Sequence, residues 1–130
     1  MDAFPYTTLT TALVILMTFG LAALAGIARG ELKPPAMTGS EKYEIANRIH
    51  MNSLETLVLL LPLVWLTAVR FGDMWGALAC VVWIVGRVMY RQAMLNDPSK
   101  RGPGMLTTLS PVIVMGVALI IVSIMTIVSG

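Results

Sequence analysis

Two short stretches of the chain carry polar side chains at spacings that place them on single helical faces. Arg48, Asn52 and Glu55 are spaced i, i+4 and i+7, and Arg87 and Tyr90 are spaced i and i+3. A carboxylate binds an ammonium group, guanidinium groups bind carboxylates, and an amide and a phenol hydrogen-bond to a peptide-like backbone. These residue types therefore favour a pocket for a small zwitterionic or anionic ligand.

The same residues also allow a purely structural interpretation. Glu55 and Arg87 can form an ion pair between two helices, with Asn52 bonding across them as polar residues do in membrane bundles. The spacing alone leaves both interpretations open. An excess of positive charge near the two stretches suits an anion. The charged residues concerned are Arg48, Arg87, Arg91 and Arg101, against Glu55 and Asp97.

Both stretches lie at the ends of helices that must cross a membrane. Only 14 uncharged residues separate Glu55 from Arg70, and only 13 separate Asp73 from Arg87. At ~1.5 Å per residue each run covers about 20 Å, whereas the hydrocarbon core of a bilayer is roughly 30 Å thick. Both helices must therefore extend past their charges, which draws polar groups to membrane depth. Polar groups at that depth are costly and usually functional.

The composition places the chain among integral membrane proteins. Of 130 residues, 57% are hydrophobic and only 12% are charged. Four apolar segments predict an all-α, four-helix membrane bundle in a single domain over residues 1–130. The predicted spans are about 7–28, 45–69, 73–95 and 106–129. A unit this small has little room for an internal cavity, so we expect a sizeable site to need an interface between protomers.

The placement of basic residues predicts the orientation in the membrane. The loop after the first span carries Arg29, Lys33 and Lys42, and the loop after the third carries Lys100 and Arg101. The positive-inside rule places both loops, and with them the polar ends of the middle spans, in the cytoplasm. A bacterial inner membrane and a eukaryotic endomembrane both fit. A cleaved signal peptide in place of the first span is the less favoured alternative, because no Lys or Arg precedes it.

Other kinds of site find little support in the sequence. One His and no clustered carboxylates predict that no metal is bound. No arrangement typical of a nucleophilic triad, a phosphate-binding loop or a nucleic-acid surface is present. Cys80 is the single cysteine and lies within the third span, which favours a small buried apolar role.

Three stretches in order carry a resemblance to a known family. They are Pro34-Pro35-Ala36-Met37-Thr38-Gly39, then Arg48-Ile49-His50-Met51-Asn52-Ser53-Leu54-Glu55 with Pro62 following, and Gly86-Arg87-Val88-Met89-Tyr90 continuing to Asp97-Pro98-Ser99-Lys100-Arg101. Together they resemble the MAPEG family, the membrane-associated proteins of eicosanoid and glutathione metabolism. That family includes the microsomal glutathione S-transferases and leukotriene C synthase. The similarity extends over nearly the whole chain.

The resemblance implies a homotrimer of four-helix protomers that binds glutathione between neighbours at the cytosolic side. The implied enzyme transfers glutathione, its co-substrate, to lipophilic electrophiles, or uses it to reduce lipid hydroperoxides. Arg101 corresponds to the arginine that stabilises the thiolate in leukotriene C synthase. Arg29 is a further candidate, displaced by one position from a family arginine. The implied glutathione-binding residues are Arg48, His50, Asn52, Glu55, Arg87 and Tyr90.

Two departures from the family pattern keep other functions open. Thr56 and Met94 stand where the eicosanoid enzymes have tyrosines, which argues against leukotriene-type activity. Some family members are non-catalytic lipid-binding proteins, so a lipid-binding scaffold of the same fold is the first alternative. A small four-span transporter is the second. Such transporters depend on an intramembrane carboxylate that handles cations, and Glu55 is outnumbered here by arginines.

Overall fold

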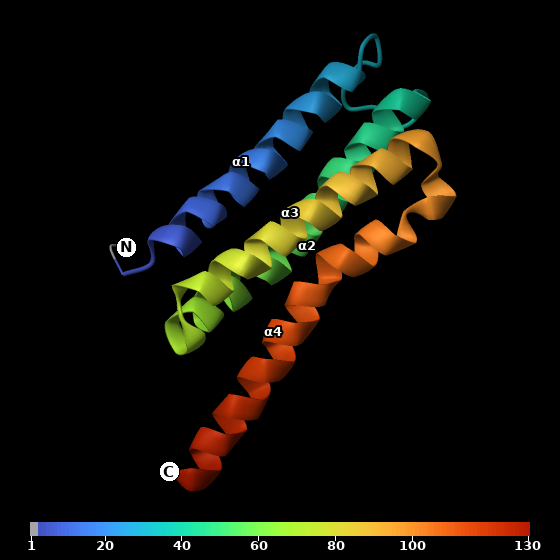
Figure 1. Ribbon diagram of the computed structural model, residues 1–130. Coiled ribbons are helices and arrows are strands. Elements are labelled where there is room, and N and C mark those ends of the chain that lie inside the picture. Colours follow the sequence, from blue (N-terminus) through green and yellow to red (C-terminus); the bar gives the residue numbers. More distant parts are fainter. Residues whose placement is uncertain (1–2) are drawn as a thin grey trace.

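Four long helices form the protein, and consecutive helices run antiparallel (Figure 1). The computed structural model describes residues 3–130. A single 3₁₀ turn, η1, precedes the last helix. The elements are α1 (Pro5–Ala28), α2 (Glu41–Phe71), α3 (Asp73–Asn96), η1 (Pro98–Lys100) and α4 (Gly102–Ser129). The four predicted spans are thus confirmed, with helix ends up to four residues beyond the predicted limits.

Each helix is long and apolar enough to cross a bilayer, which confirms an integral multi-pass membrane protein. The 31 residues of α2 extend over roughly 46 Å, and the 24 residues of α3 over roughly 36 Å. Both exceed the roughly 30 Å of a hydrocarbon core. The prediction that α2 and α3 continue past their charged residues is therefore confirmed.

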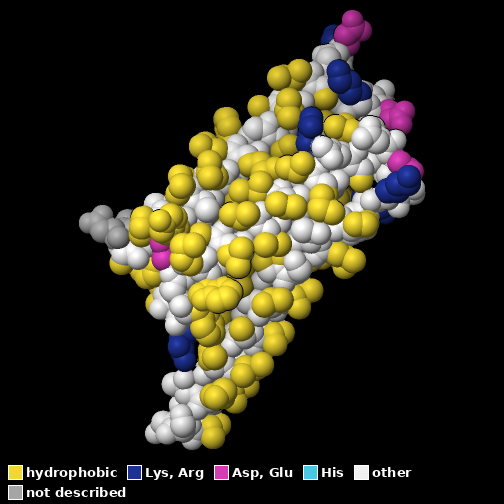
Figure 2. Space-filling model, in the orientation of Figure 1, with side chains coloured by type: hydrophobic (Ala, Val, Ile, Leu, Met, Phe, Trp, Pro, Cys, Tyr) yellow, Lys and Arg dark blue, Asp and Glu magenta, His cyan; other side chains and the backbone are white. Residues whose placement is uncertain are grey.

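Charged and apolar side chains lie on different parts of the surface. Most charged side chains on the visible face gather at one end of the bundle, while apolar side chains cover its long flank (Figure 2). The clustered end holds the α1–α2 loop and the α3–α4 connection (Figure 1). An apolar flank is the expected surface for a protein whose solvent there is lipid.

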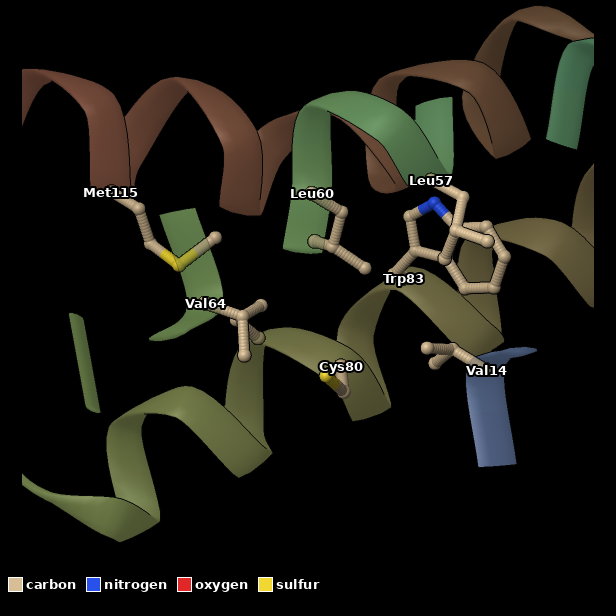
Figure 3. Packing of buried hydrophobic residues seen from close by; sticks show 8 residues of the cluster. Val14, Leu57, Leu60, Val64, Cys80, Trp83 and Met115 are labelled. Atoms are coloured by element: carbon tan, nitrogen blue, oxygen red, sulfur yellow. The ribbon is translucent and has the colours of Figure 1, made fainter. Parts of the chain in front are cut away.

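The core of the bundle lies around one tryptophan. The side chain of Trp83 is fully buried and lies among Val14, Leu57 and Leu60 (Figure 3). Its indole Nε1 donates a 3.2 Å hydrogen bond to the hydroxyl of Thr56, so its one polar atom has a partner. Thr56 thus acts as a core acceptor in this chain. Cys80, which lies in the same cluster, is fully buried as predicted.

The loops fix the helix ends in two places. Ser40 caps α2, because its hydroxyl accepts a 3.3 Å hydrogen bond from the backbone N–H of Tyr43. At the opposite end of the bundle, the Asp73 carboxylate accepts from the backbone N–H groups of Tyr6 at 2.9 Å and Thr7 at 2.7 Å. A carboxylate at a helix N-terminus satisfies free N–H groups and complements the helix dipole. The contact joins α1 to the turn between α2 and α3.

The helices α3 and α4 cross closely at two glycines. A Cβ atom on Gly86 would lie 2.5 Å from the backbone N of Thr108, and one on Gly104 would lie 2.5 Å from the backbone N of Tyr90. Small residues at such crossings let membrane helices approach backbone to backbone. Beyond this crossing α4 bends away from α3 (Figure 1). The buried residues of α4 all lie in its first half, ending at Met115.

Candidate functional site

A polar cavity of about 510 Å³ lies at the end of the bundle that carries the two basic loops. The walls come from α2, α3, the η1 turn and the start of α4. Its lining residues are Arg48, Asn52, Tyr90, Met94, Pro98, Arg101 and Met105. The structure therefore brings together four of the residues that the sequence singled out, from two helices and the loop that follows them. The i, i+4 spacing of Arg48 and Asn52 is what places both on one wall.

Arg87 lies behind this cavity and is 1% exposed. Its Nε and Nη2 donate to the hydroxyl of Thr108 at 3.0 and 2.9 Å, and its Nη1 donates to Asn52 Oδ1 at 2.7 Å and Ser53 Oγ at 3.2 Å. The Sδ atom of Met105 accepts from Nη2 at 3.4 Å. All five donor positions of the guanidinium group are therefore occupied. The arginine connects α2, α3 and α4 at one point.

The predicted ion pair between Glu55 and Arg87 is wrong. Among the side chains of residues 3–130, no carboxylate pairs with Arg87, and Glu55 is exposed. The side chains that reach Arg87 from α2 are Asn52 and Ser53, less than one turn before Glu55. The physical reason is the direction of each side chain around α2, which points Asn52 toward α3 and Glu55 away from it. The positive charge of Arg87 therefore has no carboxylate partner within residues 3–130, directly behind the wall of the cavity.

The contact with Arg87 also orients Asn52 and Tyr90. Because Asn52 Oδ1 accepts from the guanidinium group, its amide nitrogen is left as a donor for a ligand. The guanidinium carbon of Arg87 lies 4.5 Å from the centre of the Tyr90 ring, a cation–π contact. In the described chain the Tyr90 hydroxyl has no hydrogen bond, so it too can bind a ligand.

Arg101 lies at the edge of the cavity, directly after the η1 turn. Its Nη1 donates a 2.9 Å hydrogen bond to the Pro98 carbonyl, which fixes the side chain over the turn. Asp97 caps the same turn by accepting from the backbone N–H and the hydroxyl of Ser99, at 3.2 and 2.7 Å. Asp97 is therefore engaged with Ser99, and the other two nitrogens of Arg101 are free for a ligand. Arg101, Arg48 and the buried Arg87 together make this cavity cationic.

Three of the predicted site residues lie elsewhere in the protomer. Glu55 is exposed, and His50 is half-buried with an Nδ1 atom that has no partner within residues 3–130. Arg29 donates to the Ala36 carbonyl at 2.8 Å and to the Tyr43 hydroxyl at 3.0 Å, so it connects the first loop to the start of α2. None of the three lines the polar cavity. Their predicted contacts with glutathione stay predictions.

Two hydroxyls at the centre of the site were missed from the sequence. Ser53 and Thr108 each donate to a carbonyl one turn earlier in their own helix, at 2.7 and 2.8 Å, and accept from Arg87. Serine and threonine commonly bond to the i−4 carbonyl in this way. The sequence did contain a signal for these two hydroxyls, since Ser53 adjoins Asn52 and Thr108 follows Gly104 by one turn. Small polar residues at that spacing are typical of helix contacts in membranes.

The fold and the cavity define a class of protein: a four-span membrane protein with a cationic pocket at one membrane surface. The sequence model of the MAPEG family, the predicted family, matches residues 7–121. An uncharacterized protein of Synechocystis sp. is 35% identical over 115 residues, which cover 86% of this chain and 84% of the relative. The chain therefore belongs to the MAPEG family, and its function belongs with glutathione or eicosanoid metabolism in membranes.

Proposed function

We propose that the protein is a membrane-bound glutathione transferase, which can also act as a peroxidase toward lipid hydroperoxides. The observation that carries the proposal is the cationic cavity, in which two arginines line the wall and a third lies behind it with no carboxylate partner in residues 3–130. No acidic side chain lines this cavity. Glutathione carries two carboxylates and one ammonium group, so its net negative charge suits these walls.

The chemistry of the proposed reaction needs a thiolate. A free thiol has a pKa of about 8.5 and is mostly neutral at pH 7, whereas the thiolate is the nucleophile. A nearby guanidinium group favours the charged form and lowers that pKa. In conjugation, the thiolate forms a carbon–sulfur bond and the leaving group departs with the electron pair of its broken bond. In the peroxidase reaction, two glutathione molecules and one hydroperoxide give the disulfide, an alcohol and water.

We propose a homotrimer with the binding sites between neighbours and facing the cytoplasm. The polar cavity lies at the end that carries both basic loops, and Glu55 and His50 lie outside its walls. A second protomer can bring a further wall to the exposed Glu55. We expect native mass spectrometry from detergent to give a trimer, because one protomer leaves this polar cluster open. A monomer or a dimer as the only species would contradict this prediction.

Binding of glutathione is the direct test of the proposed function. Isothermal titration of the detergent-purified protein with glutathione should give saturable binding. The ultraviolet absorbance of the thiolate should rise at pH 7 when glutathione is added. Binding without thiolate formation would favour a non-catalytic role, and no binding would contradict the proposal as a whole.

Replacing Arg48 by alanine should weaken glutathione binding. Arg48 lines the cavity, and a hydrogen bond to a charged group commonly contributes about 1.5–3 kcal/mol, or roughly 10- to 150-fold in Kd. Lys42→Ala is the matched control, because it removes a cation from the same end of the bundle without touching the cavity. Gel filtration must show that both variants assemble like the parent. Equal affinity in Arg48→Ala and the parent would place the ligand elsewhere.

A non-enzymatic lipid-binding role is the second candidate, and one residue favours it. Met94, at the position of a tyrosine in the eicosanoid enzymes, lines the cavity here with an apolar thioether. A less polar wall accommodates a lipid better than it accommodates a peptide. The thiolate measurement separates the two candidates, since a scaffold has no reason to ionise the thiol.

A further inference from the structure

The loop between α1 and α2 contains a methionine whose sulfur atom has two hydrogen-bond donors. Met37 is 51% exposed and lies outside the four helices, at the end of the bundle that carries both basic loops (Figure 1). Its Sδ atom accepts from Nη2 of Arg29 at 3.6 Å and from the hydroxyl of Tyr43 at 3.5 Å. Among the methionines of residues 3–130, Met105 also accepts at sulfur, but it is partly buried in the polar cavity.

The two donors are held in place by contacts of their own. The Tyr43 side chain is only 4% exposed, and its hydroxyl accepts from Arg29 Nη2 at 3.0 Å. Arg29 Nη1 donates to the Ala36 carbonyl at 2.8 Å, and the guanidinium carbon lies 4.3 Å from the centre of the Tyr43 ring. The phenol donates its one proton to the sulfur, and Nη2 divides its two protons between the phenol and the sulfur. The positions of both donors are therefore set by groups other than Met37.

These donors are stronger than the acceptor that they share. A thioether sulfur is a weak hydrogen-bond acceptor, whereas hydrogen bonds from a guanidinium group to oxygen are among the strong ones in proteins. Oxidation of methionine adds one oxygen to the sulfur and turns an apolar side chain into a polar one. An oxygen added to Met37 would lie on the sulfur that both donors already face, so neither donor has to change its other partners. The loop thus contains a preformed binding site for a sulfoxide oxygen.

We propose that Met37 is a site of reversible oxidation by hydroperoxides, and that Arg29 and Tyr43 bind the oxygen of the resulting sulfoxide. In this reaction a lone pair of Sδ attacks the terminal oxygen of the hydroperoxide, so that a sulfur–oxygen bond forms and the oxygen–oxygen bond breaks. The electron pair of the broken bond leaves with the alkoxide, which takes up the hydroxyl proton. The products are methionine sulfoxide and an alcohol. The Arg29 cation stabilises the negative charge that develops on the leaving oxygen.

The consequence of this oxidation is a more stable junction between α1 and α2. Arg29 directly follows α1 and Tyr43 lies in the first turn of α2, so the sulfoxide joins the ends of both helices to the loop. Oxidation of a methionine in an apolar core is disruptive, because the new polar group lacks a partner there. Met37 is the opposite case, since its side chain is exposed and its donors are in place before the oxygen arrives.

Peptide mapping by mass spectrometry tests the proposal, after brief treatment of the full-length protein in nanodiscs with tert-butyl hydroperoxide. Met74 is the matched control, because it is 63% exposed at the opposite end of the bundle and has no hydrogen bond at its sulfur within residues 3–130. Exposure alone predicts that Met74 reacts at least as fast as Met37. We expect Met37 to react about tenfold faster, which is the effect of one hydrogen bond to a charged group.

The chirality of the sulfoxide gives a second measurement on the parent protein. Arg29 Nη2 and the Tyr43 hydroxyl lie 3.0 Å apart, so both donors are on the same side of the sulfur. The oxygen should therefore be added mainly on that side, and one epimer should predominate. Two classes of methionine sulfoxide reductase exist, and each reduces one epimer. After digestion, one class should reduce most of the oxidised Met37 peptide, whereas the two classes should reduce similar shares of the Met74 peptide.

Variants of the two donors test their roles. Tyr43→Phe keeps the ring and removes only the hydroxyl, and Arg29→Gln removes the cation. Both should slow the oxidation of Met37 toward the rate of Met74 and make the two epimers more nearly equal. Amide hydrogen exchange over residues 30–40 should slow when the parent is oxidised, but not when Tyr43→Phe is oxidised. Met37→Leu is the control for oxidation elsewhere, and the same treatment should leave exchange in its loop unchanged.

Four results would overturn the proposal. The first is a Met74 that reacts as fast as Met37, and the second is an equal mixture of epimers at Met37 in the parent. The third is an unchanged Met37 rate in folded Tyr43→Phe and Arg29→Gln. The fourth is faster hydrogen exchange in the oxidised loop, since the donors then do not hold the sulfoxide. The measurements on the parent remain decisive if the variants do not fold. The oxidation needs no ligand in the polar cavity, so a failure to bind glutathione leaves this proposal standing.

Discussion

Replacing Gly86 by alanine is expected to destabilise the protein and to disrupt the polar cavity. The added Cβ would lie 2.5 Å from both the backbone N and the hydroxyl of Thr108, and 2.8 Å from its Cα. Backbone atoms cannot give way as a flexible side chain does, so α4 must move away from α3. Overpacking of this kind commonly costs about 1–3 kcal/mol, more than the ~1 kcal/mol that alanine gains over glycine in a helix.

The same displacement should reach Arg87. The Thr108 hydroxyl accepts two of the hydrogen bonds of Arg87, so moving it leaves a buried guanidinium group partly unsatisfied. Asn52, which Arg87 orients, then loses its fixed position in the cavity. We therefore expect a lower melting temperature together with weaker glutathione binding in Gly86→Ala.

Two other glycines make the comparison decisive. A Cβ on Gly20, in α1, meets nothing within 4 Å, so Gly20→Ala should gain the helix propensity alone and melt slightly above the parent. Gly104→Ala repeats the experiment from the α4 side, because its Cβ would approach the backbone of Tyr90. We expect the melting temperature to fall in Gly86→Ala and Gly104→Ala and to rise slightly in Gly20→Ala. A Gly86→Ala variant as stable as Gly20→Ala would show that α3 and α4 do not cross as closely as described.

The sequence predicted the fold and part of the site for clear physical reasons. A lipid solvent demands long apolar helices, so hydropathy alone was enough to place the four spans. Helical periodicity placed Arg48 with Asn52, and Arg87 with Tyr90, because those pairs lie within one element. The cavity combines the α2 pair with Tyr90 of α3 and Arg101 of the following loop, and Arg87 lies behind it.

The contacts between elements could not be derived from periodicity. The helical period puts Asn52 and Glu55 on one broad face of α2, but it does not show which of them points at α3. Asn52 and Glu55 are three residues apart, so at about 100° per residue their side chains point about 60° apart around the helix. Only the packing of α3 against α2 decides which of the two contacts Arg87. The role of Thr108 depends in turn on the crossing at Gly86. The divergence of α4 from α3 beyond this crossing lay outside the sequence reasoning for the same reason.

Loss of Arg101 is expected to act on the reaction far more than on binding. The side chain is fixed over the η1 turn by its bond to the Pro98 carbonyl and lies at the edge of the cavity, with two nitrogens free. We expect Arg101→Ala to leave the Kd for glutathione within a few fold. The thiolate absorbance at pH 7 should fall, because without the guanidinium group the thiol pKa returns toward its free value. Conjugation of a chloronitrobenzene should slow by about 10²–10³-fold, the usual effect of removing one group that stabilises developing negative charge.

The alternative role for Arg101 is that of a topology signal. A variant of the preceding residue distinguishes this role from the catalytic one. Lys100 carries the same charge in the same turn but does not line the cavity. Lys100→Ala therefore removes an equal share of the positive-inside signal while leaving the proposed thiolate site intact. If Arg101 acts on sulfur, Lys100→Ala conjugates like the parent and Arg101→Lys recovers part of the lost rate, because the charge is kept but the planar fork is not. If Arg101 only orients the chain, a correctly inserted Arg101→Ala protein keeps its full rate, and the catalytic role is then refuted.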